Sequence, residues 1–185
     1  MHFLEYYNKN IVQYDLINKF IYKKLKALPK LKFIVVQFCF KKYELKNLIT
    51  SFVALRFITN KKGSIIKSKT TNISLKIRKG HPIGCKVILK HTRMNQFLEK
   101  LINNFSISNK ITAFNRNENN LFSFKIKNIL NFSELEKNYR FFNRLNNPLN
   151  INIVMDVANY EQFNFLLKSY KIQVIKCKCN SIGRV

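Results

Sequence analysis

The chain has 185 residues, and its 34 lysines and arginines against 9 aspartates and glutamates give a formal net charge of +25. Its residues are 46% hydrophobic and 14% aromatic, which argues against intrinsic disorder and allows one folded domain with a real core. A strongly basic chain that can still build a core points to a polyanionic partner, with nucleic acid ahead of an anionic membrane.

The first sixty residues show helix and strand signals in turn. Apolar residues at spacings of three and four predict an amphipathic helix over 4–21. Residues 31–40 are rich in β-branched and aromatic side chains, which predicts a buried strand. A second helix is predicted over 45–55, followed by a turn over 60–64. The residues that define the first helix are Leu4, Tyr7, Ile11, Tyr14, Ile17 and Ile21.

The next segment predicts two paired strands. Residues 72–78 alternate between apolar and polar or basic side chains, which predicts a strand with one apolar face. Gly80, Pro82 and Gly84 then indicate a loop, and a second strand is predicted over 85–90. If these strands pair as neighbours, one face of the sheet carries a row of cations.

The remaining elements complete an α+β pattern. Apolar residues predict a third helix over 94–105 and a short closing helix over 163–170, and strands are predicted over 121–127 and 149–155. Strands and helices that do not alternate regularly predict an α+β fold, a mostly antiparallel sheet with helices packed on one face. We expect a single domain over 1–175.

The C-terminus is predicted to be a basic tail over 176–185. Cys177 and Cys179 form a C-x-C in it, but no second cysteine or histidine pair stands elsewhere to complete a zinc site. The four cysteines are too few and too scattered for a disulfide framework, which favours a reducing compartment. We therefore expect no metal and no other cofactor.

The cations are concentrated in a window without acids. Residues 45–98 contain twelve lysines and arginines and no aspartate or glutamate. Such uncompensated charge favours a role in binding nucleic-acid phosphates. The candidate RNA-binding residues are Lys61, Lys67, Lys69, Lys76, Arg78, Lys79, His81, Lys86, Lys90 and Arg93.

No catalytic constellation is recognisable in the sequence. None of the carboxylates stands in an H-E-x-x-H arrangement, and neither glycine-rich phosphate-binding motif is present. We therefore predict no catalytic residues and no enzyme. The main alternative is a small basic organellar nuclease or maturase, which needs clustered acids for Mg²⁺. A peripheral membrane protein ranks last, because the cations are concentrated on predicted strands and turns rather than on one helix face.

The segment IRKGHPIGCKVILK, followed by TRMNQFLEKLI, resembles the large-subunit ribosomal protein five family. In that family a strand ending in K-I-R-x-G precedes P-I-G-x-K-V-T-L-R and a helix that opens around a methionine and carries F-x-x-R-L. The matching residues are Lys76, Ile77, Arg78, Gly80, Pro82, Ile83, Gly84, Lys86, Val87, Leu89, Met94, Phe97 and Leu101.

The resemblance implies a structural constituent of the large ribosomal subunit that acts in translation. Family members lie in the central protuberance and bind 5S rRNA and neighbouring large-subunit rRNA. They bring one loop near the P-site tRNA, and that loop corresponds here to residues 67–72. Another surface contacts a protein of the small-subunit head. No membrane contact is implied.

The chain departs from the family at three positions that supply short polar contacts to 5S rRNA. Gln37 replaces an asparagine, Lys61 a glutamine and Ile88 a threonine. We therefore hypothesise a divergent member whose 5S rRNA contact is altered or lost. Heavy use of Asn, Lys, Ile, Phe and Tyr indicates AT-rich coding. The N-terminus resembles neither a secretory nor a transit peptide. These features favour an organelle-encoded protein of a mitochondrial matrix ribosome, with the cytoplasm of an AT-rich bacterium or another organelle as alternatives.

Overall fold

The computed structural model describes residues 3–24, 27–40, 44–105, 112–117, 121–143, 145, 147–157 and 159–170. The strands are β1 (Lys30–Cys39), β2 (Ser64–Lys67), β3 (Pro82–Leu89), β4 (Thr112–Asn117), β5 (Leu121–Ile126) and β6 (Leu149–Asp156). The α-helices are α1 (Phe3–Tyr7), α2 (Gln13–Lys19), α3 (Leu45–Thr59), α4 (His91–Phe105), α5 (Ser133–Glu136), α6 (Tyr139–Phe142) and α7 (Tyr160–Ser169). The predicted tail over 176–185, with Cys177 and Cys179, lies outside the described residues.

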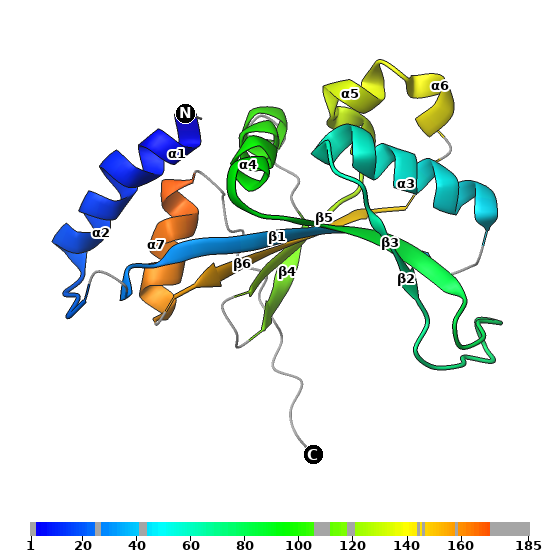
Figure 1. Cartoon of the computed structure of the whole chain (residues 1–185), viewed down its shortest axis with the longest axis horizontal. Helices are drawn as coiled ribbons and strands as arrows, with labels where there is room; N and C mark the ends of the chain where they lie inside the picture. Colours follow the sequence, from blue (N-terminus) through cyan, green and yellow to red (C-terminus); the bar gives the residue numbers. More distant parts are fainter. Residues whose placement is uncertain are drawn as a thin grey trace.

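The strands form one six-stranded sheet in the order β2-β3-β1-β6-β5-β4, and each neighbouring pair is antiparallel (Figure 1). Helices α3, α4, α5 and α6 lie on one side of it. Alternation along the strands explains the layering, because Ile34, Val36 and Phe38 of β1 are fully buried while Val35 and Gln37 between them are half-buried. The predicted α+β class is confirmed.

Helix α4 and strand β1 follow the sequence prediction closely, whereas β3 begins at Pro82, so Pro82 and Gly84 of the predicted loop belong to the strand. Met94, Phe97, Leu98 and Leu101 are all buried, as the apolar spacing of the third helix predicted. Strands β5 and β6 and helix α7 also lie where they were predicted. The core therefore forms between the helices and one face of the sheet.

The N-terminal helix buries a different face from the one predicted. Ile17 is exposed, whereas Val12 and Leu16 are fully buried. The exposed Ile21 lies beyond the helix, because α2 ends at Lys19 rather than at residue 21. The reason for the changed face is a π-helical segment over Asn8–Val12 between α1 and α2. A π turn holds more residues than an α turn, so it rotates the later residues around the helix axis and changes which of them face the core.

The predicted strand over 72–78 is wrong. Residues 73–76 form a tight turn, and within this range only Asn72 and Ile77 pair, through an isolated antiparallel bridge. The Asn72 side chain accepts hydrogen bonds from the Ser74 hydroxyl at 2.6 Å and from the Leu75 amide at 3.3 Å, which favours a turn over a strand. Strand β2, at Ser64–Lys67, pairs with β3 in its place.

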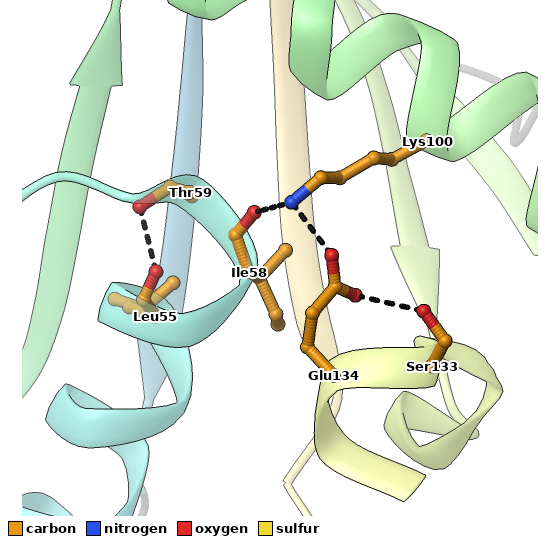
Figure 2. A network of polar contacts seen from close by, with 6 residues as sticks. All are labelled: Leu55, Ile58, Thr59, Lys100, Ser133 and Glu134. Carbon is orange, nitrogen blue, oxygen red and sulfur yellow. Dashed lines mark hydrogen bonds and ion pairs between the residues drawn. The ribbon is translucent and has the colours of Figure 1, made fainter. Parts of the chain in front are cut away.

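Helices α3, α4 and α5 are joined by one partly buried lysine contact (Figure 2). The Lys100 Nζ of α4 lies 2.7 Å from Glu134 Oε1 and also donates to the Ile58 carbonyl of α3 at 3.2 Å. The Ser133 hydroxyl donates to the second carboxylate oxygen of Glu134. Burial acts to raise the pKa of Glu134, but hydrogen bonds and the charge of Lys100 outweigh it and lower that pKa below its ordinary value.

This ion pair predicts an acid-dependent contribution to stability. Because folding lowers the pKa of Glu134, its ionised form stabilises the fold fully at pH values above the ordinary pKa of 4.5. This stabilisation is lost as the pH falls through the lower pKa of the folded state. We expect Lys100→Met to lower the free energy of unfolding by about 1 kcal/mol at pH 7. The difference from the parent should shrink at pH 3 in urea melts.

The matched control is the exposed pair formed by Lys9 and Glu5, whose side chains are 52% and 32% exposed. Such surface pairs contribute little, so Lys9→Met should leave the unfolding free energy nearly unchanged at both pH values. A Lys100→Met effect that is equal at pH 7 and pH 3 would contradict the assignment of an ionised pair.

Candidate nucleic-acid interface

The β2–β3 hairpin extends past the sheet as an ordered loop over 68–81 (Figure 1). The Ser68 amide donates to the His81 carbonyl at 2.8 Å, and the Gly80 amide donates to the Ser68 carbonyl at 3.0 Å. Farther out, Asn72 and Ile77 exchange amide-to-carbonyl hydrogen bonds of 2.8 and 3.0 Å. The loop is therefore a narrow extension of the hairpin, held by its own backbone.

Exposed cations occupy both sides of this loop. The Lys76 backbone is left-handed, with φ of 52°, at the end of the turn. Among the described residues the ion pairs are Lys9–Glu5 and Lys100–Glu134, so no carboxylate in that part of the chain pairs with the lysines or the arginine of the loop. We name Lys67, Lys69, Lys76, Arg78, Lys79 and His81 the hairpin cluster, in which His81 is half-buried and the four lysines and the arginine are exposed.

Lys86 lies on the sheet, within a row of polar side chains that crosses five strands. It pairs with Ser64 of β2 and Gln37 of β1, Gln37 pairs with Asn150 of β6, and Asn150 pairs with Lys125 of β5. Partners in antiparallel register share one face, so all five side chains project from the face opposite the helices. We call Ser64, Lys86, Gln37, Asn150 and Lys125 the polar row.

The three positions at which the chain departs from the family that it resembles lie close together. Gln37 of β1 is in the polar row. Ile88 lies two residues after Lys86 on β3 and projects from the same face, with its side chain 38% exposed. The Lys61 Nζ donates to the Ile88 carbonyl at 2.7 Å. Changes at all three positions therefore alter one continuous part of the surface.

The remaining two candidates lie apart from the hairpin cluster. Lys90 follows the end of β3 and Arg93 is in the first turn of α4, so the length of β3 separates them from the loop. Both are exposed. The structure thus divides the predicted RNA-binding residues into three groups. These are the hairpin cluster, Lys86 of the polar row together with Lys61, and Lys90 with Arg93 beyond the end of β3.

Sequence reasoning missed the contribution of β5 and β6. Asn150 and Asn152 of β6 alternate with the buried Leu149 and Ile151, and Asn152 pairs with Ser123 of β5. The signal available in the sequence was the alternation of apolar and polar residues in LNINIV (149–154) and LFSFKI (121–126), which predicts one polar face on each strand. These residues extend the polar surface, because strands distant in sequence are neighbours in the sheet.

The described residues offer no activated group for catalysis. They contain no cluster of three His, Cys, Asp or Glu side chains that could hold a metal ion. Burial raises the pKa of both Cys39 and Cys85 despite nearby hydrogen bonds, so neither thiol is primed as a nucleophile. Within the same part of the chain, no helix is long and apolar enough to span a membrane.

Comparisons with known proteins all point to one family. The family model for the C-terminus of the ribosomal protein L5 family matches residues 82–174. The large ribosomal subunit protein uL5m of Reclinomonas americana is 32% identical over 95% of this chain and 100% of its own length. The uL5 protein of Geotalea uraniireducens (strain Rf4) is 34% identical over 90% of this chain and 94% of its own.

An α+β fold with a projecting basic hairpin is typical of a nucleic-acid-associated protein. The chain belongs to the uL5 family of large-subunit ribosomal proteins. That family is structural rather than enzymatic, and its members similar to this chain include both mitochondrial and bacterial proteins.

Proposed function

We propose that this protein is a scaffold of the central protuberance of the large ribosomal subunit, where it binds rRNA through the hairpin cluster. The observation that carries the proposal is the ordered, exposed loop over 68–81, whose lysines and arginine have no ion-pair partner among the described residues. Structured RNA is recognised largely through its phosphate backbone and shape, which suits cations on a narrow rigid extension. Residues 67–72, which run from the end of β2 along one side of this loop to its turn, are the part that would approach the P-site tRNA.

The polar row and the residues around it form the second RNA contact in this proposal, and here the contact with 5S rRNA is weakened. Ile88 cannot donate the hydrogen bond of a threonine hydroxyl, and Lys61 is already engaged with the Ile88 carbonyl. Phosphate attraction persists while the readout of specific groups is reduced. A protein of the small-subunit head is a further expected neighbour.

We place the protein in a mitochondrial ribosome. The support is its match with uL5m over nearly all of both chains, together with the AT-rich coding bias. Bacterial relatives match almost as well, so the cytoplasm of an AT-rich bacterium is the competing location.

The test is to restore the family residues. The triple variant Gln37→Asn, Lys61→Gln, Ile88→Thr should bind a bacterial 5S rRNA more tightly than the parent chain. Each recovered hydrogen bond contributes about 1 kcal/mol, so the dissociation constant should fall on the order of 100-fold in filter binding at fixed salt.

Val35→Thr is the matched control. Val35 pairs directly with Ile88, so a threonine there would present a hydroxyl on the same face, at a position to which no RNA contact is assigned. It should leave binding unchanged. Equal 5S rRNA affinity for the parent and the restored chain would show that the three departures do not weaken the contact.

A further inference from the structure

Helix α3 exposes an apolar ridge on the side that faces away from the sheet. The ridge consists of Leu45, Ile49, Val53 and Phe57, whose side chains are 56%, 51%, 37% and 44% exposed. These residues are spaced by four, so they form one continuous line along the helix surface. The ridge runs almost the full length of α3.

The ridge is additional to the face that α3 already buries. Leu48, Leu55 and Ile58 lie in or at the edge of the core, so the helix is apolar on two opposite sides. A surface helix of a monomer needs only one apolar face, and a helix that is apolar all round is normally enclosed. Contiguous exposed apolar surface of this kind marks an interaction site.

Two cations share the exposed side of the helix. Lys46 follows the first ridge residue and Arg56 precedes the last, and at 100° per residue both fall within the arc that the ridge occupies. Both are exposed, and neither is ion-paired within the described part of the chain. A cation therefore lies on the arc of the ridge near each of its ends, while the exposed Glu44 that precedes the helix accepts a hydrogen bond from the Asn47 side chain.

A second element adds apolar surface next to α3. Helix α6 lies beside it in Figure 1, and the Phe57 and Phe142 rings meet edge to face with centroids 6.0 Å apart. Tyr139 and Phe141 of α6 are 54% and 75% exposed. Since Phe57 belongs to both the ridge and this contact, the ridge ends next to further exposed aromatic groups.

We propose that this ridge is the docking site for an amphipathic α-helix of another protein, one that carries carboxylates at the edges of its apolar face. Side chains spaced by four form the ridge that fits the groove of a partner helix in the commonest mode of helix packing. The carboxylates would pair with Lys46 and Arg56. The contact is separate from the RNA surfaces and does not depend on them.

Other occupants fit the same surface less well. Leu45, Ile49 and Val53 are aliphatic and offer no stacking platform, so an RNA strand would leave them without a matching partner. A second copy of the chain would bring like charges together, on a molecule whose net charge is already +25. The chain's own residues 171–185 contain no Asp or Glu to pair with the two cations.

The experiment uses native large subunits that contain the full chain. A carbodiimide joins an amine to a carboxylate only when the two are in direct contact, so Lys46 should become linked to an Asp or Glu of another protein. Mass spectrometry of the joined peptide should show apolar residues at spacings of three and four beside that acid. A photoreactive benzoylphenylalanine at position 49 should link to the same peptide.

Variants establish that the ridge itself is required. Ile49→Asn with Val53→Asn should reduce the Lys46 crosslink at least tenfold without adding a carboxylate that could react with Lys46 itself. The purified chain should keep its fold, because both side chains are exposed. Ile17→Asn is the matched control, since Ile17 is a 45% exposed apolar residue on α2, outside the ridge. It should leave the crosslink unchanged.

Crosslinks from position 49 to rRNA, to a second copy or to nothing would each overturn the proposal. So would a linked peptide without the apolar spacing. If the double asparagine variant fails to fold, Arg56→Glu serves instead, because it reverses one flanking charge without touching the apolar line. An unchanged crosslink in that variant would likewise count against the proposal.

Discussion

Replacing Lys69, Arg78 and Lys79 together with glutamate should weaken binding of the full chain to large-subunit rRNA by at least about 1,000-fold. All three side chains are exposed on the loop that extends the β2–β3 hairpin. A hydrogen bond or ion pair to a charged group contributes about 1.5 kcal/mol, and charge reversal adds repulsion from the phosphates. The slope of log affinity against log salt should also fall by about 2 to 3, since each phosphate contact contributes roughly 0.7 to 0.9.

The matched control for this prediction changes the same amount of charge elsewhere. Lys23, Lys24 and Lys30 are exposed cations near the start of β1, at the opposite end of the sheet from the loop (Figure 1). Their replacement with glutamate should reduce affinity and salt slope much less. Equal losses in the two triple variants would show that net charge, rather than the hairpin cluster, governs binding.

Gly84→Ala destabilises the fold by about 3 kcal/mol, the second large effect we expect. Gly84 of β3 pairs with Cys39 of β1, and a Cβ atom there would lie 2.2 Å from the Phe38 carbonyl oxygen. The obstacle is backbone, so the two central strands would have to separate. The melting temperature should fall by roughly 10 °C, at about 3 °C per kcal/mol for a chain of this length.

Gly80→Ala separates steric crowding from backbone strain. Gly80 has φ of 88°, which disfavours any L side chain, but nothing lies within 4 Å of a Cβ built there. Its replacement should cost only about 1 kcal/mol. If Gly84→Ala costs no more than Gly80→Ala, the close approach of β1 and β3 is not the constraint that fixes a glycine at position 84.

The sequence predicted the parts of the fold in which periodicity and burial agree. The run LKFIVVQFCF forms β1 because its even-numbered members from Ile34 to Phe38 face the helices. The apolar spacing from Met94 to Leu101 likewise became the buried face of α4. In both segments the local pattern and the tertiary environment require the same structure.

The predictions that failed depend on information that the local pattern does not contain. Alternation over 72–78 resembled a strand, but the Asn72 side chain caps a turn there. The apolar spacing from Leu4 to Ile21 assumed a regular helix, and the π segment over Asn8–Val12 changed the buried face. Pairing across the sheet brought Gln37 beside Asn150, a contact that no local pattern specifies.

The candidate site was predictable in composition but not in arrangement. The cations over 67–79 were identified from charge alone, and they do lie together on one loop. Lys90 and Arg93 came from the same charged window, but β3 carries them away from that loop. Charge density along a chain therefore indicates which residues to consider, and the topology decides which of them can share one partner.

The most direct test is a cryo-electron microscopy reconstruction of the native large ribosomal subunit that contains this chain. Our account predicts the chain in the central protuberance, with the Lys69, Arg78 and Lys79 side chains against rRNA phosphates. It also predicts a reduced contact, or none, between 5S rRNA and the surface around Gln37 and Ile88. A hairpin loop that meets only solvent or protein, or a subunit without this chain, would contradict it.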